Sequence, residues 1–119
     1  MDESCTVYRT MEYLSKRWSL LIILELFKGQ EDGKRYSELK RDLPGITPKM
    51  LSTRLKELED EGLIENVVDS SSFPVRSDYF LTPAGWALID VVKALKDWAL
   101  AWKIDNVACG LQDCADCHL

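Results

Sequence analysis

The stretch GITPKMLSTRLKELEDEGLIE, residues 45–65, predicts a helix whose two ends carry different charge. Thr47 is a typical N-cap residue, and Pro48 suits the first helical position, where an amide hydrogen would have no partner. Apolar side chains then recur at three- and four-residue steps and predict a buried stripe formed by Leu51, Leu55 and Leu58. Gly62 predicts the end of the helix. A helix that only filled a core would need no such division of charge, so its outer face indicates a further role.

Three further helices and a hairpin are predicted around this stretch. Apolar periodicity predicts one helix from Cys5 to Phe27, a short helix within residues 36–45, and a long helix from Ala84 to about Asn106. The runs LIENVVD (residues 63–69) and VRSDYFL (residues 75–81) are strand-like, and the polar turn between them predicts a hairpin. This order of elements describes a winged helix-turn-helix, mainly α with a small β-hairpin.

Basic charge is concentrated around the start of the quoted helix. The whole chain carries a net charge of −5, which argues mildly against a nucleic acid as its partner. Between Lys34 and Lys56, however, seven residues are basic and two are acidic, whereas Glu57 to Glu61 holds four acids and no base. An ordinary solvated surface is the plainer explanation of such a charge run. The helix-turn-helix context favours the more specific explanation, that these residues form a face that binds DNA.

The predicted outward face of the quoted helix suits the major groove of DNA. If the leucine stripe faces the core, a rotation of about 100° per residue turns Lys49, Thr53 and Lys56 outward, with Ser52 beside them. Donors and small side chains near a helix N-terminus reach base edges, and the helix dipole favours a nearby phosphate. The acids from Glu57 onward would be repelled by phosphate, so the division of charge orients the helix.

Other basic residues are candidates for contacts that position the protein on DNA without reading its sequence. Arg76, at the predicted hairpin tip, is a candidate for a phosphate or a minor-groove contact. Lys34 is a further phosphate candidate. The full set of predicted DNA-binding residues comprises Arg35, Lys40, Arg41, Lys49, Ser52, Thr53, Arg54, Lys56 and Arg76.

Three segments resemble the HxlR-type winged-helix transcription regulators: KRWSLLIILELFKG (residues 16–29), RYSELKRDLPGITPKMLSTRLKELEDEGLI (residues 35–64) and YFLTPAG (residues 79–85). The resemblance extends from Cys5 to about Trp102. It implies a homodimer that binds double-stranded operator DNA and is held together by its N- and C-terminal helices. Several members of the family are understood to sense electrophiles or oxidants through a cysteine near the N-terminus, and Cys5 lies at the matching place.

The long C-terminal helix carries more apolar surface than the rest of the chain is expected to cover. Trp86, Trp98 and Trp102 all lie on it, while the hairpin and the short helices are too small to cover both this helix and the first one. A second subunit is the natural cover, and it would also supply two half-sites for DNA. The predicted dimer interface comprises Leu88, Val92, Leu95, Trp98 and Trp102.

Cys5 is the leading candidate for a thiol sensor. It is expected at the start of the first helix, whose dipole favours the reactive thiolate. The neighbouring acids Asp2 and Glu3 act in the opposite direction. Thiol chemistry at this position would then control DNA binding.

Residues 107–119 form a cysteine-rich tail beyond the predicted winged domain of residues 1–106. Cys109, Cys114 and Cys117 are candidates for a thiol–disulfide switch, within one subunit or between two. The spacing Cys114-x2-Cys117 is also that of a zinc half-site, for which Cys109 would be a further ligand. A tail with idle thiols is the third possibility, and the sequence leaves all three open.

Other classes of function find little support in the sequence. The longest apolar stretch, Leu20 to Leu24, is too short to cross a membrane, and the acidic N-terminus does not resemble a signal peptide. We therefore expect no membrane partner and a cytoplasmic location. No catalytic motif or phosphate-binding loop is evident, so neither an enzyme activity nor a cofactor is expected. The alternative to a transcription regulator is a winged-helix module for protein–protein interaction without specific DNA binding.

Overall fold

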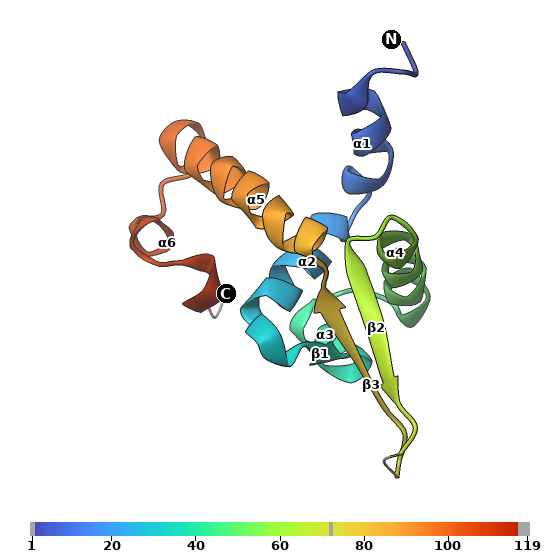
Figure 1. The fold of residues 1–119 in the computed structure, drawn as a ribbon. Coiled ribbons are helices and arrows are strands. Elements are labelled where there is room, and N and C mark those ends of the chain that lie inside the picture. Colours follow the sequence, from blue (N-terminus) through green and yellow to red (C-terminus); the bar gives the residue numbers. More distant parts are fainter. Residues whose placement is uncertain (1, 72, 117–119) are drawn as a thin grey trace.

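The computed structural model of the chain describes residues 2–71 and 73–116. The helices, in chain order, are α1 (Thr6–Leu14), α2 (Ser19–Lys28), α3 (Tyr36–Asp42), α4 (Pro48–Asp60), α5 (Pro83–Trp102) and α6 (Val107–Leu111). The strands are β1 (Lys34–Arg35), β2 (Ile64–Asp69) and β3 (Arg76–Leu81). Figure 1 shows α2, α3 and α4 packed at the centre, with the β2–β3 hairpin, α1 and α5 extending from them in three directions.

A three-stranded antiparallel sheet with strand order β1-β3-β2 lies beside these helices. The predicted hairpin is confirmed: β2 and β3 pair along their whole length, from Ile64 opposite Leu81 to Asp69 opposite Arg76. Strand β1, which pairs Lys34 with Tyr79, was not predicted. Two residues are too few to show the alternation that identifies a strand from sequence.

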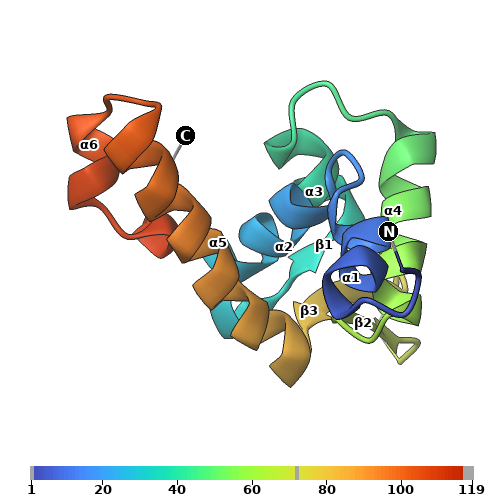
Figure 2. The same ribbon diagram turned by 90° about the horizontal axis from the view of Figure 1, so that it is seen from above.

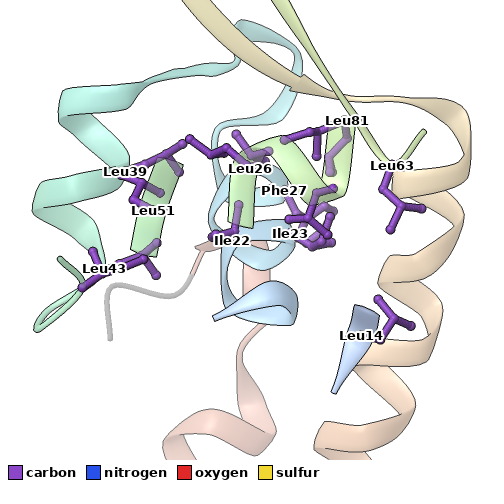
Figure 3. Packing of buried hydrophobic residues seen from close by; sticks show 14 of the residues in the cluster. Leu14, Ile22, Ile23, Leu26, Phe27, Leu39, Leu43, Leu51, Leu63 and Leu81 are labelled. Carbon is purple, nitrogen blue, oxygen red and sulfur yellow. The ribbon is translucent and has the colours of Figure 1, made fainter. Parts of the chain in front are cut away.

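The core forms where α2, α3 and α4 meet. The predicted inward stripe of α4 is confirmed, because Leu51, Leu55 and Leu58 are all buried. Figure 3 shows Leu39, Leu43 and Leu51 packed together beside the side chains of α2. Full burial of an aliphatic side chain stabilises a fold by about 1.5–3 kcal/mol, so this cluster fixes α4 firmly against the body of the molecule.

Side-chain caps define where α4 and α5 begin. The Met50 amide donates to Thr47 Oγ1 over 3.1 Å, and the Gly85 amide donates to Thr82 Oγ1 over 3.2 Å. Both helices have a proline at their first position, and the start predicted at Thr47 and Pro48 is confirmed. The long helix α5 ends at Trp102, a few residues before the predicted end.

The single N-terminal helix predicted from Cys5 to Phe27 is wrong, because the chain forms two helices there. Trp18 has a φ of 82°, in the left-handed region, and separates α1 from α2. The Arg17 guanidinium lies over the Trp18 ring, 4.9 Å from its centroid. As a result α1 leaves the body of the molecule, as both Figure 1 and Figure 2 show.

The tail folds back on the body of the molecule after α5. Lys96 Nζ donates to the Gln112 carbonyl over 2.6 Å, and Lys93 Nζ lies 3.4 Å from Asp113 Oδ2. Cys114 packs against the core beside α2. Among the helices in the described part of the chain, none is both long and apolar enough to cross a membrane.

Candidate nucleic-acid interface

A tight turn between α3 and α4 sets the angle at which α4 leaves the core. Gly45 has a φ of 88° within it, a conformation that glycine adopts without strain. Leu43 and Ile46, on either side, are buried, so the turn is fixed to the core. Helix α4 therefore starts at a defined position at the edge of the molecule.

Helix α4 presents the predicted polar face to solvent along its first three turns. Lys49, Ser52, Thr53 and Lys56 are all exposed, on the side opposite the leucine stripe. Exposed donors near a helix N-terminus are suited to base edges and phosphates. The structure thus brings four of the predicted DNA-binding residues together on one surface.

Tyr36, which was not among the predicted residues, links α3 to the start of α4. Its hydroxyl donates to the Pro48 carbonyl over 3.1 Å, and Ser52 Oγ lies 3.5 Å from the same hydroxyl. These contacts hold the two helices of the helix-turn-helix at a fixed separation. An aromatic residue at the start of a short helix suggests only a core residue in the sequence, so no pattern pointed to this role.

Two of the predicted phosphate contacts lie exposed around α3. Arg35 precedes the helix, and Arg41 lies in its last turn, where its Nε donates to Asp42 Oδ1 over 3.1 Å. Lys40, beside Arg41, is half-buried. Arg35 directly precedes Tyr36, whose hydroxyl contacts α4, and exposed basic side chains on the first helix of a helix-turn-helix suit contacts to a DNA backbone.

Lys34 does not join this surface. Its ammonium lies 3.1 Å from Glu25 Oε2 and 2.8 Å from Asp42 Oδ2, and its side chain is 13% exposed. Burial alone would lower the pKa of Lys34, but hydrogen bonds to Asp42 and Glu25 outweigh that effect and raise it. Lys34 therefore ties β1 to α2 and α3, which corrects its grouping with the phosphate contacts.

Arg54 also points away from the exposed face of α4. Its Nε donates to the Arg17 carbonyl over 2.9 Å, and its Nη1 lies 3.1 Å from Glu57 Oε1. The Arg54 side chain is 14% exposed. Its guanidinium is thus engaged within the chain, whereas Lys49 and Thr53 face solvent.

The second half of α4 is acidic at its surface, as the sequence indicates. Glu59, Asp60 and Glu61 are exposed at the end of the helix that is remote from Lys49. Lys56 Nζ lies 3.2 Å from Asp60 Oδ1, an exposed pair of the kind that contributes little to stability. DNA phosphates would be repelled at this end and attracted at the other.

The hairpin forms a wing whose arginine already has a carboxylate partner. Arg76 Nε lies 2.8 Å from Asp78 Oδ2, and Arg35 Nε lies 3.9 Å from Asp78 Oδ1. Arg76 is exposed, so it remains accessible to DNA. A phosphate would have to compete with Asp78 for it.

Comparison with known proteins agrees with this geometry. The profile of the HxlR-like helix-turn-helix family matches residues 13–106. The chain belongs to this family. The helix-turn-helix is therefore formed by α3 and α4, and β2 and β3 form the wing.

Several relatives in the family are named as transcription regulators. The uncharacterized HTH-type transcriptional regulator YvaP of Bacillus subtilis is 39% identical over 102 residues, which cover 85% of this chain and 91% of YvaP. The solved structure of the reduced form of the transcriptional regulator YodB from B. subtilis is 36% identical, with a TM-score of 0.73, and covers 86% of this chain and 97% of YodB. Diamide-treated YodB matches at 37% identity, a TM-score of 0.67, and 85% and 97% coverage.

The predicted dimer interface of this family member lies on α5. Leu95, Trp98 and Trp102 are exposed, Trp102 by 76% of its surface, whereas Leu88 and Val92 are half-buried. Trp86, by contrast, packs edge-on against Phe27 with ring centroids 5.7 Å apart. Two exposed tryptophans on one helix are a large apolar surface for a single chain.

The cysteines of the chain lie in two separate places. Cys5 is the N-cap residue of α1, while Cys109 and Cys114 line a cavity of about 340 Å³ between α2, α5 and the tail. Figures 1 and 2 both show α1 and α6 at opposite sides of the molecule. Cys117, the remaining candidate for a switch or a metal ligand, lies outside the described residues. Within residues 2–71 and 73–116, no group of three or more His, Cys, Asp or Glu side chains is arranged to hold a metal ion.

Proposed function

We propose that this chain is a homodimeric, thiol-responsive transcription regulator that reads operator DNA with the exposed polar face of α4. The observation that carries the proposal is the exposed face formed by Lys49, Ser52, Thr53 and Lys56, here called the reading face. On the opposite side of the helix lies the buried leucine stripe. This face lies at the N-terminus of a firmly packed helix, which is the part of a recognition helix that contacts base edges. Membership of a helix-turn-helix family supports the same reading.

Phosphate contacts around the reading face would set its register on DNA. Arg35, Lys40 and Arg41 flank the start of α4, and Arg76 lies on the wing. Such contacts raise affinity without adding sequence specificity. The acidic end of α4 would point away from the duplex.

Dimerisation through the terminal helices is supported by the apolar surfaces they expose. On α1, Val7 and Met11 are exposed, and on α5 the exposed residues include Leu95, Trp98 and Trp102. Burying these surfaces against a second copy would remove apolar area from water at about 25 cal/mol per Å². A two-fold dimer also places two recognition helices on successive turns of the major groove.

Thiol control is supported by the position of Cys5 at the junction of the chain end and α1. Cys5 is half-buried, so a reagent in solution can reach it, and α1 belongs to the proposed dimer surface. The similar protein YodB has solved structures in reduced and diamide-treated forms. We propose that modification of Cys5 changes the arrangement of the two subunits and thereby the spacing of their recognition helices.

A DNA-binding titration tests the reading face. The probes are a duplex that the wild-type protein selects from random-sequence DNA, here called the selected duplex, and a scrambled duplex of equal length. We expect tighter binding to the selected duplex, and a loss of affinity for both as salt is raised. Equal affinities at both salt concentrations would contradict sequence-specific reading.

The alternative function is a winged-helix module that binds another protein rather than specific DNA. The net charge of −5 and the pairing of Arg76 with Asp78 favour it. The same titration separates the two functions, because a protein-binding module would show no preference for the selected duplex. Neither function involves catalysis, and the regulator would act in the cytoplasm, where its operator lies.

A further inference from the structure

The junction between α1 and α2, residues 15–18, joins α1 to the body of the molecule next to the core contacts of Leu14 and Tyr13. Leu14 is the one buried residue of α1, and the helix ends directly after it. Trp18 then reverses the backbone with a φ of 82°, and α2 begins at Ser19. A surface that holds α1 in place therefore acts on the rest of the chain through residues 15–18 as well as through the core contacts of Leu14 and Tyr13.

Two contacts join this junction to the middle of α4, and a third, within α4, links them. Arg54 Nε donates to the Arg17 carbonyl over 2.9 Å, and Arg54 Nη1 lies 3.1 Å from Glu57 Oε1. The other carboxylate oxygen, Glu57 Oε2, lies 3.0 Å from Lys16 Nζ. Glu57 thus bridges a residue of α4 and a residue of the junction, and Arg54 binds both Glu57 and the junction backbone.

We infer that Arg54 and Glu57 are positioning residues, which orient the recognition helix α4 relative to the α1–α2 junction. This inference rests on the proposed function, because it assigns meaning to the orientation of α4 on DNA. The leucine stripe holds α4 by apolar contact, which is not directional. A guanidinium fork and a carboxylate that each make two directed bonds restrict the rotation and tilt that apolar packing leaves free.

Through these contacts, a change in the position of α1 can alter the orientation of the reading face. Lys49 and Thr53 lie on the same rigid helix as Arg54, within two turns of it. A shift of the junction that follows a change at α1 moves the Arg17 carbonyl and Lys16, and α4 follows through Arg54 and Glu57. Sequence reading depends on sub-ångström placement of such side chains, so a small rotation is enough to alter it.

The experiment compares Glu57→Gln with Glu59→Gln. Both variants remove one negative charge from α4, so their effect on phosphate repulsion is matched, but Glu59 is exposed and lies outside the Arg54–Glu57–Lys16 contacts. Affinities for the selected and the scrambled duplex are measured, together with the melting temperature of each variant. We expect Glu57→Gln to lower the ratio of the two affinities by about tenfold, as when one member of a coupled cluster is removed. Glu59→Gln is expected to leave this ratio within about twofold of wild type.

A second pair of variants protects the test against loss of folding. Lys16→Gln removes the exposed member of the cluster, and Lys103→Gln removes an exposed lysine at the end of α5. We expect Lys16→Gln, but not Lys103→Gln, to lower the affinity ratio in the same direction as Glu57→Gln. The conservative variant Glu57→Asp should restore part of the affinity ratio that Glu57→Gln loses. If the two variants have equal melting temperatures, the difference in the ratio reports positioning rather than stability.

The possible results bear on different proposals. If the wild-type protein discriminates between the two duplexes but Glu57→Gln and Glu59→Gln have equal ratios, the positioning role is overturned while the reading face stands. If Glu57→Gln does not fold, equal ratios for Lys16→Gln and Lys103→Gln overturn it. If the wild-type protein itself does not discriminate, the proposed function fails first, and the positioning role fails with it.

Discussion

Lys49 and Arg41 are both exposed on the helix-turn-helix but have different surroundings. Lys49 is exposed in the first turn of α4, where no described ion pair engages its ammonium, while Arg41 already pairs with Asp42 near the end of α3. In the proposed complex, a cation on the reading face would contact base edges, whereas a cation beside α3 would contact only the DNA backbone. Substitutions at the two positions should therefore affect different properties of binding.

Lys49→Ala and Thr53→Ala are expected to weaken binding to the selected duplex by about tenfold each, and binding to the scrambled duplex much less. Arg41→Ala should weaken binding to both duplexes alike and reduce the slope of log affinity against log salt by about one. Fluorescence anisotropy titrations at two salt concentrations measure both effects. If none of the three variants changes affinity for the selected duplex, α4 is not the reading helix.

Asp42 is expected to stabilise the fold only above acidic pH. Burial alone would raise its pKa, but hydrogen bonds from Lys34 and Arg41 lower it below the ordinary value of 3.8. The contribution is therefore fully present above pH 3.8 and is lost as the pH falls through the lowered pKa of the folded state. Asp42→Asn should reduce the free energy of unfolding by about 1 kcal/mol at neutral pH.

Urea unfolding of wild type and Asp42→Asn at a series of pH values measures this difference. The gap between the two proteins should be constant near neutrality and shrink toward zero below pH 3.8. A gap that persists at low pH would mean that Asp42 contributes by packing rather than by charge.

Periodicity predicts the outward position of Lys49 and Thr53 because the leucine stripe defines the opposite face of the same helix. Arg54 lies between the two faces, and its partner is the Arg17 carbonyl, 37 residues earlier in the chain. The role of Lys34 in β1 likewise depends on a distant partner, because its ammonium pairs with Glu25 of α2. A single sequence shows the charge of such residues but not the tertiary partner that decides their role.

At the scale of elements, the break between α1 and α2 is the clearest case of information missing from the sequence. Apolar residues at Val7, Met11, Leu14 and Trp18 keep helical spacing across it, so the pattern predicts one continuous helix. The structure instead buries Leu14 and leaves Val7 and Met11 exposed. The left-handed Trp18 backbone, which produces this difference, has no marker such as glycine.

Helix α5 is expected to form the centre of the dimer. Leu95→Glu should yield monomers or insoluble protein, because it would place an unpaired charge within a buried interface. Its matched control is Ala101→Glu, an exposed position about 120° around the same helix from Leu95. Light scattering coupled to gel filtration at micromolar concentration gives the mass of each variant. A wild-type protein that elutes as a monomer, or two variants that behave alike, would remove α5 from the interface.

At the scale of the whole molecule, the two proposed dimer helices leave the body in different directions. Figure 2 shows α1 on one side of the central helices and α5 with α6 on the other. Cys5 is therefore remote from Cys109 and Cys114 of its own chain. A disulfide between Cys5 and either Cys109 or Cys114 is therefore expected to join two subunits, so oxidation would lock the geometry of the dimer rather than that of one chain.

The last prediction is that Cys5 controls how DNA binding responds to oxidation. With diamide as oxidant, two thiols lose two protons and two electrons to the reagent's N=N bond, which becomes a hydrazine, and a disulfide forms. Wild-type protein should then change its affinity for the selected duplex and run as a covalent dimer on a non-reducing gel. Cys5→Ser should do neither, while Cys109→Ser, Cys114→Ser and Cys117→Ser would identify the partner thiol, which we expect to be Cys109 or Cys117. An unchanged wild-type affinity, or an equal response in Cys5→Ser, would show that Cys5 is not the switch. A stoichiometric metal ion in the purified protein would instead assign the tail cysteines to a zinc site.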